Sequence, residues 1–440
     1  MQLIKKTIAE GITLNVIPTD KFKTDRISVN FLTPLDPEKA ALNALLVKVL
    51  SRGTKSWPDL KSLSRALDDI YSTNLSDYNY KRGETQIFGF SLDMLKSEYA
   101  VDETDIMSEA LKILSEVLFS PALENGGLRT DYVEAEKKNL IDDIKAKINN
   151  KSGWALERCV EEMCAGERYS VSVTGTIEQV EKIKPEDLTK HYKNIFRNCR
   201  IEIFYVGDAD IDRIYGLVKN LMAPLSDGVK APALSADVKR KAENEPKEIT
   251  ENILAKQGKL VLGFRSGSVL EDPDYHMFSL FCELYGGSPT CKLFENVRER
   301  LSLCYYCWAS KEAFKGIMLV SSGIENTDKD KAQDEILRQL RLVAEGDFTD
   351  EELENAKRSL CNGYKGIYDR RGSLEAWYLG RLLAGRDEDS PLKNVDKIMK
   401  VTREEVMQKA AGVSLDTVYF MYGTEEADAA EEGEEEDVSD

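Results

Sequence analysis

The sequence repeats one order of elements in its two halves, and this repeat restricts the folds open to the chain. Residues 26–54 begin with the apolar alternation of a β-strand, pass an acidic turn with proline, continue as an amphipathic helix and end at Gly53. Residues 259–288 follow the same order. Each half then closes on a strand that stops near a glycine, Gly207 in the first half and Gly423 in the second. Two homologous domains are therefore expected.

The strand and helix patterns inside each half predict the fold class. Residues 84–94 and 315–324 alternate as strands with one buried face, whereas residues 105–120 and 330–346 have the spacing of amphipathic helices. Strands and helices do not alternate one for one, which disfavours a parallel, doubly wound sheet. The predicted class is α+β, with each domain an antiparallel sheet covered by helices.

The length of 440 residues also fits two cores of about 200 residues each. We expect an N-terminal domain at 1–224, a linker at 225–245 that is rich in small, polar and proline residues, and a C-terminal domain at 246–424. Residues 425–440 hold ten carboxylates and no Lys or Arg. Such a segment repels itself, and an acidic, disordered, solubilising tail is expected.

Composition and charge exclude several functions. The net charge of -18 falls to about -8 without the tail, and no cluster of basic residues offers a face for nucleic acid. No apolar run approaches the roughly 18 residues of a membrane span, and no signal-peptide core follows the first lysines. A soluble, cytoplasmic protein is expected.

The eight cysteines and two histidines indicate no obvious reactive centre. Without a secretory signal, reduced thiols are favoured over disulfides. Cys304 and Cys307 form a C-x-x-C, but in a strand-like run where residues three apart face opposite ways, so buried thiols are predicted rather than a zinc knuckle or redox pair. His191 and His276 each stand alone, which disfavours a zinc site made by this chain, and no G-x-S-x-G nucleophile motif is present.

Three stretches carry a resemblance to a known family: the Arg-Gly-Thr at 52–54 after the first helix, the Gly-Gly-Ser at 286–288 followed by LFENVRE, and the LCYY at 303–306. With the duplicated layout, they resemble the insulinase or pitrilysin family of zinc peptidases, in the branch that includes mitochondrial processing peptidase. The resemblance covers nearly the whole chain apart from the tail. It implies two half-shells enclosing a peptide chamber.

The family's inverted zinc motif, H-x-x-E-H, is degenerate in this sequence. Its His, Glu and His positions fall on Ala44, Val47 and Lys48, and its later Glu ligand falls on Asp143, seven residues after Glu136. Ala and Val offer no ligand atom and no base. No zinc or other cofactor is therefore expected in this chain. Lys48 either pairs with Asp143 in place of the metal or extends to solvent, and both alternatives stay open.

The family's second motif is retained. In the family, an Arg and a Tyr close over the zinc from the opposite domain and donate to the substrate carbonyl as it becomes an oxyanion; the matching residues here are Arg298 and Tyr305, with Ser302 where Gly is usual. The alternative is structural, with Arg298 at a helix C-terminus and Tyr305 as a strand aromatic.

This combination resembles the non-zinc partner in heterodimeric bacterial members of the family. The predicted function is a subunit that is inactive alone, binds extended peptide, and supplies Arg298 and Tyr305 in trans to a zinc-bearing homologous subunit. Residues 84–93 are the expected sheet edge for the peptide. The alternative is a catalytically inert scaffold or peptide-holding protein of the same fold.

Overall fold

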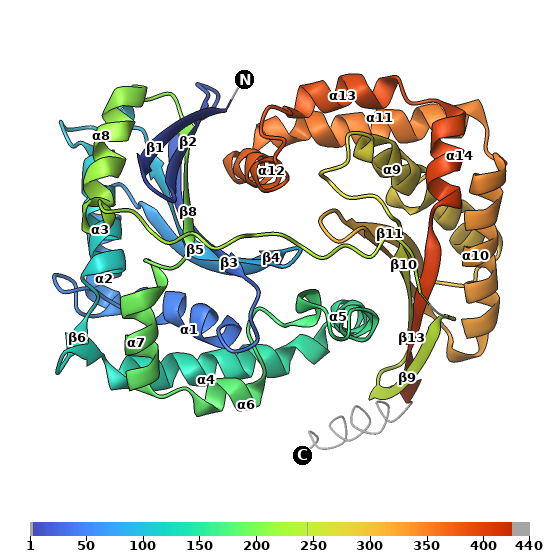
Figure 1. Cartoon of the computed structure of the whole chain (residues 1–440), viewed down its shortest axis with the longest axis horizontal. Coiled ribbons are helices and arrows are strands. Elements are labelled where there is room, and N and C mark those ends of the chain that lie inside the picture. The colour runs from blue at the N-terminus through green and yellow to red at the C-terminus, as the bar shows by residue number, and fades with distance from the viewer. Residues whose placement is uncertain (1–2, 244, 425–440) are drawn as a thin grey trace, which may run out of the picture. The chain divides into compact units, whose positions relative to one another are not determined.

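The computed structural model describes residues 3–243 and 245–424, and in it the chain forms two units, each built on one β-sheet (Figure 1). Unit 1 contains the residues up to 145 together with 171–236 and 367–390, and unit 2 contains 146–170, 237–366 and the residues from 391 onward. The predicted acidic tail at 425–440 lies outside the described residues.

The sheet of unit 1 has six strands in the order β1-β2-β8-β3-β5-β4. Neighbouring strands are antiparallel except β2 and β8, which run parallel. The strands are β1 (Ile4–Ala9), β2 (Ile12–Pro18), β3 (Thr24–Pro34), β4 (Asn74–Arg82), β5 (Thr85–Leu95) and β8 (Arg200–Gly207).

Both faces of this sheet are covered, because side chains alternate along each strand. Val29 and Phe31 of β3 belong to the large apolar core that helices cover on one side. Leu32 of the same strand packs instead with Leu374 and Leu379 on the other side. The helices of unit 1 are α1 (Ala40–Leu50), α2 (Leu60–Asp68), α3 (Ile106–Phe119), α4 (Thr130–Ala146), α6 (Ile177–Lys182), α7 (Pro185–Ile195), α8 (Ile211–Leu221) and α12 (Arg371–Leu383), with a small hairpin of β6 (Leu123–Glu124) and β7 (Gly127–Leu128).

The predicted peptide-binding edge at residues 84–93 is wrong. These residues form most of β5, which lies inside the sheet with β3 on one side and β4 on the other. The apolar run that suggested a half-buried strand is buried on both faces. Edge strands of this sheet are β1 and β4.

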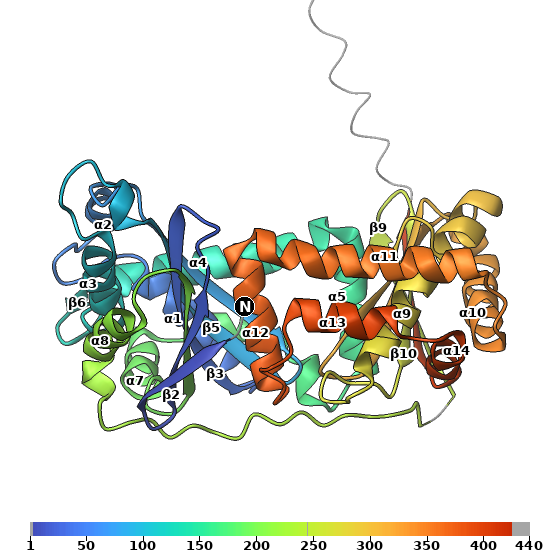
Figure 2. The same cartoon turned by 90° about the horizontal axis from the view of Figure 1, so that it is seen from above.

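Unit 2 is built on a five-stranded sheet in the order β11-β12-β10-β13-β9, antiparallel except for the parallel pair β13 and β9. Its strands are β9 (Lys247–Leu254), β10 (Gly258–Arg265), β11 (Tyr306–Glu312), β12 (Ile317–Ile324) and β13 (Ser414–Thr424). Its helices are α5 (Lys151–Met163), α9 (Tyr275–Cys282), α10 (Lys329–Glu345), α11 (Asp350–Gly366), α13 (Pro391–Met399) and α14 (Arg403–Ala411). Figure 2 shows α11 running beside α13.

The duplication is visible in the lengths of matched helices. In the first half, α4 has 17 residues, a 3-10 helix of three residues follows, and α5 has 13. The second half repeats the same lengths in α11, a 3-10 helix and α12. The last helix of each series packs on the sheet made mainly by the other half: α5 covers β10 and β13, whereas α12 covers the strands of unit 1.

The predicted fold class, α+β with antiparallel sheets covered by helices, is confirmed. Within residues 3–243 and 245–424, no helix combines the length and apolar character needed to cross a lipid bilayer.

Candidate functional site

Helix α1 carries the three positions of the degenerate zinc motif. Ala44 and Val47 are each 2% exposed and belong to the apolar core of unit 1. Their methyl groups have no lone pair for a metal, and no water-activating carboxylate stands at position 47. The residues present therefore do not fit the family's zinc.

Lys48, the third position, pairs with Asp143 on α4. Its ammonium nitrogen lies 3.5 Å from Asp143 Oδ2, so the structure has the ion pair, one of the two alternatives that the sequence leaves open. The Lys48 side chain is 33% exposed and that of Asp143 is 63% exposed. An ion pair this accessible to water stabilises a protein by about 0–1 kcal/mol. The ion pair thus occupies two of the family's ligand positions, and it contributes little to the stability of the fold.

Glu136, the first acid of the family's helix spacing, is held by a residue that sequence reasoning missed. Arg52 Nη1 donates to Glu136 Oε1 over 3.2 Å, and Asn139 Nδ2 donates to the other oxygen. The Arg52 guanidinium also stacks on the Tyr132 ring at 5.3 Å. Arg52 follows the degenerate motif closely, and a charged residue so close to the buried helix is the sequence signal for a counter-charge nearby.

Across the described parts of the chain, no group of three or more His, Cys, Asp or Glu side chains is placed to hold a metal ion. This holds at the family position and elsewhere within residues 3–243 and 245–424.

The two residues of the second motif lie together on unit 2. Arg298 is near the end of a π-helix, Phe294–Arg300, and its guanidinium stacks on the Phe294 ring at 4.7 Å. Tyr305 directly precedes β11. Both side chains line one concavity of about 380 Å³ and are open to water, Arg298 being 42% and Tyr305 54% exposed. Its lining is Arg298, Glu299, Ser302, Leu303, Cys304, Tyr305, Glu325 and Asp328.

Tyr305 has a partner that was not predicted. Its hydroxyl donates to Glu325 Oε1 over 2.6 Å, and this bond, with the nearby negative charge, raises the pKa of Tyr305. Tyr305 N donates to Gly323 O, so the turn of the chain into β11 places the phenol beside the end of β12. The signal for Glu325 in the sequence is the antiparallel pairing of the strand after Tyr305 with the strand that ends at Ile324, which brings Glu325 close to Tyr305.

Ser302 stands where the family usually has a glycine, and its backbone has a conformation that favours glycine. Its φ is +50°, in the left-handed region where a Cβ costs about 1–2 kcal/mol. Glycine loses about 0.5–1 kcal/mol more backbone entropy on folding. Ser302→Gly is therefore expected to raise the free energy of unfolding by about 0.5–1 kcal/mol, measured by urea denaturation. Ser302→Ala, which keeps the Cβ, should give no gain; equal effects of the two substitutions would contradict this account.

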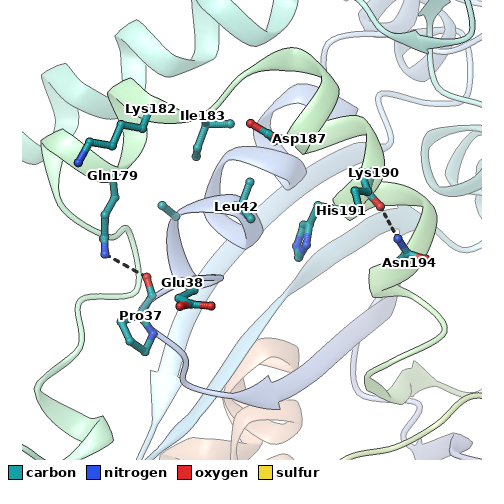
Figure 3. Close-up of a pocket in the computed structure, with 11 residues that line it drawn as sticks. Pro37, Glu38, Leu42, Gln179, Lys182, Ile183, Asp187, Lys190, His191 and Asn194 are labelled. Carbon is teal, nitrogen blue, oxygen red and sulfur yellow. Dashed lines mark hydrogen bonds between the residues drawn. The ribbon is translucent and has the colours of Figure 1, made fainter.

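A separate cavity of about 810 Å³ lies in unit 1 between α1, α6 and α7 (Figure 3). The His191 ring points between α7 and α1, and its Nε2 lies 2.7 Å from Asn43 Oδ1. Asn43 Nδ2 donates to Gln86 Oε1, so Asn43 Oδ1 is the acceptor and His191 Nε2 carries the hydrogen. His191 therefore anchors α7 to α1 as a neutral donor. The wall of the cavity is formed by Pro37, Glu38, Ala41, Leu42, Gln179, Lys182, Ile183, Asp187, Lys190, His191 and Asn194.

This histidine gives unit 1 a pH dependence. Burial, followed by the charge of Lys39, lowers the pKa of His191 from 6.5 to about 4. Between about pH 6.5 and 4, His191 is protonated in the unfolded chain but neutral in the folded one. The free energy of unfolding therefore falls as the pH drops through this range. Between pH 7.5 and 5, the loss from His191 is about 2 kcal/mol.

His191→Gln keeps a donor near Nε2 and cannot titrate. The stability difference between wild type and His191→Gln should shrink by about 2 kcal/mol from pH 7.5 to pH 5, measured by urea denaturation. The comparison also cancels Asp25, whose pKa burial raises to about 6 and whose contribution runs in the opposite direction. A difference that does not change with pH would contradict this account, because it would mean that His191 has the same pKa in the folded and unfolded chains.

The comparisons with known proteins show the family to which the chain belongs. Residues 182–360 match a family described as the peptidase M16 inactive domain. The chain is 32% identical over 420 residues to the probable inactive metalloprotease YmfF of Bacillus subtilis strain 168, covering 95% of this chain and 97% of that protein. It is 20% identical over 312 residues to the uncharacterized zinc protease YmxG of the same organism, covering 69% and 73% of the two chains.

A solved structure shows the same fold over the whole length. The crystal structure of a conserved protein from Enterococcus faecalis V583 has a TM-score of 0.89 and 26% identity, covering 97% of this chain and all of that one. The match to the Bacillus relative spans nearly the whole of both proteins, and α1 lacks the ligands of a zinc site. This chain belongs to the insulinase-like M16 peptidase family, among homologues of the inactive type.

Proposed function

We propose that this protein is the non-metal-binding subunit of a two-subunit zinc peptidase, in which it binds peptide and lends Arg298 and Tyr305 to a zinc-bearing partner. One observation carries the proposal. Positions 44 and 47 have no ligand atoms, yet Arg298 and Tyr305 line one water-accessible concavity. A chain that had lost the whole reaction would have no chemical need to keep two donors together at a surface.

Arg298 is suited to hold a peptide carbonyl as negative charge develops on its oxygen. Its nearest carboxylate is Glu299, 3.5 Å from Nε, and stacking on Phe294 limits the positions of the guanidinium. A held guanidinium presents several N–H donors without reorganising during the reaction. The partner would supply the metal and the base; this chain would supply the donor.

Tyr305 would add a second donor. A phenol is protonated at neutral pH, and the raised pKa of Tyr305 leaves it so, which allows it to donate. In the free protein that hydrogen goes to Glu325. A bound peptide carbonyl would have to replace Glu325 as the acceptor of the Tyr305 hydroxyl. Tyr305 would then donate to the substrate only in the complex, where the developing negative charge strengthens the hydrogen bond.

The edge strand β4 is the proposed place for peptide on unit 1. Within the described residues, β4 pairs with β5 on one side only and has no strand on the other. An extended peptide can add there through main-chain hydrogen bonds, which give affinity with little sequence preference.

The proposed partner is a homologue that keeps H-x-x-E-H. Bacillus subtilis has relatives of both kinds, one named as a probable inactive metalloprotease and one as a zinc protease. Their presence in one organism supports a division of roles between two similar chains.

A second function has its own support. The Glu325 carboxylate stands in the same concavity and already occupies the Tyr305 hydroxyl. A fixed negative charge there opposes an oxyanion. This favours an inert scaffold or peptide-holding protein, in which Arg298 and Tyr305 are structural.

Co-expression with a zinc-bearing relative from the same organism tests the proposal. The two chains are purified together and assayed on a quenched-fluorescent peptide library, beside each chain alone. We expect a stable complex that cleaves peptide and an isolated chain that does not. Cleavage by this chain alone, or a mixture no more active than the relative by itself, would overturn the proposal.

A further inference from the structure

Both halves of the chain, residues up to 236 and residues from 237 onward, are needed to complete each unit. Unit 2 takes residues 146–170 from the first half, and unit 1 takes residues 367–390 from the second half. Two segments are thus exchanged between the halves. The contacts of these segments decide whether the halves are joined only by the peptide chain or also by a protein interface of their own.

The segment from the first half is packed into the core of unit 2. Ala155 and Cys159 of α5 are 0% exposed and share an apolar cluster with residues of β10 and β13. On the same helix, Arg158 Nη2 lies 2.6 Å from Glu251 Oε1 of β9. Apolar burial and an ion pair therefore attach α5 to three strands that all belong to the second half.

The segment from the second half is packed on unit 1 in the same manner. Leu374 and Leu379 of α12 are 0% exposed and share an apolar cluster with residues of β2, β3, β5 and β8. Glu375 Oε2 lies 2.7 Å from Arg26 Nε, and Glu375 Oε1 accepts from Ser28 Oγ over 2.5 Å. All these partners belong to the first half. Separation of the halves would expose the apolar cluster to water, which opposes it.

The direct connection between the halves contains a stretch without helix or strand, residues 228–240. The backbone N–H of Val229 is hydrogen-bonded within unit 1, and Lys315 of unit 2 donates to Asp237 O. Between these attachments, residues 232–236 make no backbone hydrogen bond with any residue that the structure describes. A cut at this place removes little of what holds the fold.

We propose that the two halves bind each other as protein partners, so that an endopeptidase that cuts within residues 232–236 converts the chain into a stable two-chain protein. The cut hydrolyses one peptide bond, and water supplies the atoms of the new carboxylate and amine ends. Each unit of the cut protein contains both chains. The inference stands apart from the proposed function, since it needs neither a zinc-bearing relative nor a peptide substrate.

Two independent domains on a linker would behave differently. They would separate when the linker is cut, and each would keep a stability that does not depend on concentration. Here the loss of one half removes α5 from unit 2 or α12 from unit 1. Folding of both units in the cut protein is therefore linked to association of the two chains.

The test uses the full chain with an enteropeptidase site inserted between Ser235 and Ala236, and the same protein before cutting is the matched control. After complete cutting, seen on a denaturing gel, both halves should elute together from gel filtration at about 1 μM, at the volume of the uncut protein. Urea should be needed to separate them. Two separate peaks, precipitation of one half, or a site that the protease does not cut in the native protein would overturn the proposal.

Tryptophan fluorescence reports on the exchange itself, because Trp154 lies on α5 and Trp377 on α12. Combining Trp57→Phe with Trp308→Phe leaves only these two of the four tryptophans. The urea midpoint of the cut protein should rise between about 1 μM and about 10 μM protein, whereas that of the uncut protein should stay constant. A midpoint of the cut protein that does not depend on concentration would mean that each half folds alone, and it would overturn the proposal.

Discussion

Glu167→Gln is expected to lower the free energy of unfolding by about 3–5 kcal/mol, because it leaves two buried cations without their shared counter-charge. Arg265 and Lys315 are both 0% exposed. Arg265 Nη2 donates to Glu167 Oε1 over 2.8 Å, and Lys315 Nζ lies 2.8 Å from Oε2. Burial alone would raise the pKa of Glu167, but hydrogen bonds from Lys315 and Arg265 bring it below its usual range. The carboxylate is therefore charged in the folded protein.

The position of this cluster explains the size of the effect. Glu167 follows α5, the helix that the first half of the chain contributes to unit 2, and Arg265 ends β10 beneath it. Arg265 also donates to Met163 O and to Asp416. The cluster of Glu167, Arg265 and Lys315 thus joins the end of α5 to the sheet of unit 2. Asp416 remains for Arg265 in the variant, whereas Lys315 loses its carboxylate partner Glu167.

A matched substitution on the surface is the control. Glu109→Gln makes the same chemical change in an exposed pair, in which Glu109 lies 2.6 Å from Lys112. Its expected cost is at most about 1 kcal/mol. Urea denaturation of the three proteins at pH 7 gives the comparison. A Glu167→Gln protein within 1 kcal/mol of wild type would mean that the cations are hydrated or discharged.

Arg298→Ala is expected to lower kcat/KM of the two-subunit complex by about 10²–10³-fold, which is the cost of removing one donor to a developing oxyanion. Tyr305→Phe, which removes only the hydroxyl, should lower it by about 10²-fold. Both losses should appear in kcat, because the donors act on charge that the substrate does not yet carry. The Kd between the two subunits should stay unchanged.

Arg338→Ala is the matched control for charge. Arg338 is an exposed arginine on α10 that pairs with Glu335, and its loss removes the same charge from unit 2. Peptide turnover of its complex should equal wild type. Wild-type turnover in the Arg298 and Tyr305 variants as well would favour the scaffold function and leave both residues with a structural role.

Much of the fold can be predicted from the sequence, because alternation and helical periodicity report which faces are buried. They do not report which strands are neighbours. For this reason the sequence predicts residues 84–93 as a sheet edge, although β4 lies beyond β5. The equal lengths of α5 and α12 reflect the same repeat, but a repeat records common descent and not the sheet on which each helix packs.

The candidate site divides in the same way. The loss at Ala44 and Val47 is readable from sequence because coordination requires particular atoms. Helix spacing and family position make the ion pair of Lys48 with Asp143 one of two alternatives, and the contact itself decides between them. Sequence patterns do not place Glu325 beside Tyr305, since this contact depends on where β11 starts and on a bend at Tyr305 that no residue type enforces.

The zinc content of the purified complex tests the central claim most directly. Elemental analysis of the active complex, of each chain alone, and of a complex whose partner lacks its histidines locates the metal. We predict one zinc for each pair of chains, lost together with cleavage when the partner's histidines are replaced, and no stoichiometric zinc in the isolated chain. Stoichiometric zinc held by this chain alone, with peptide cleavage that depends on it, would contradict the account.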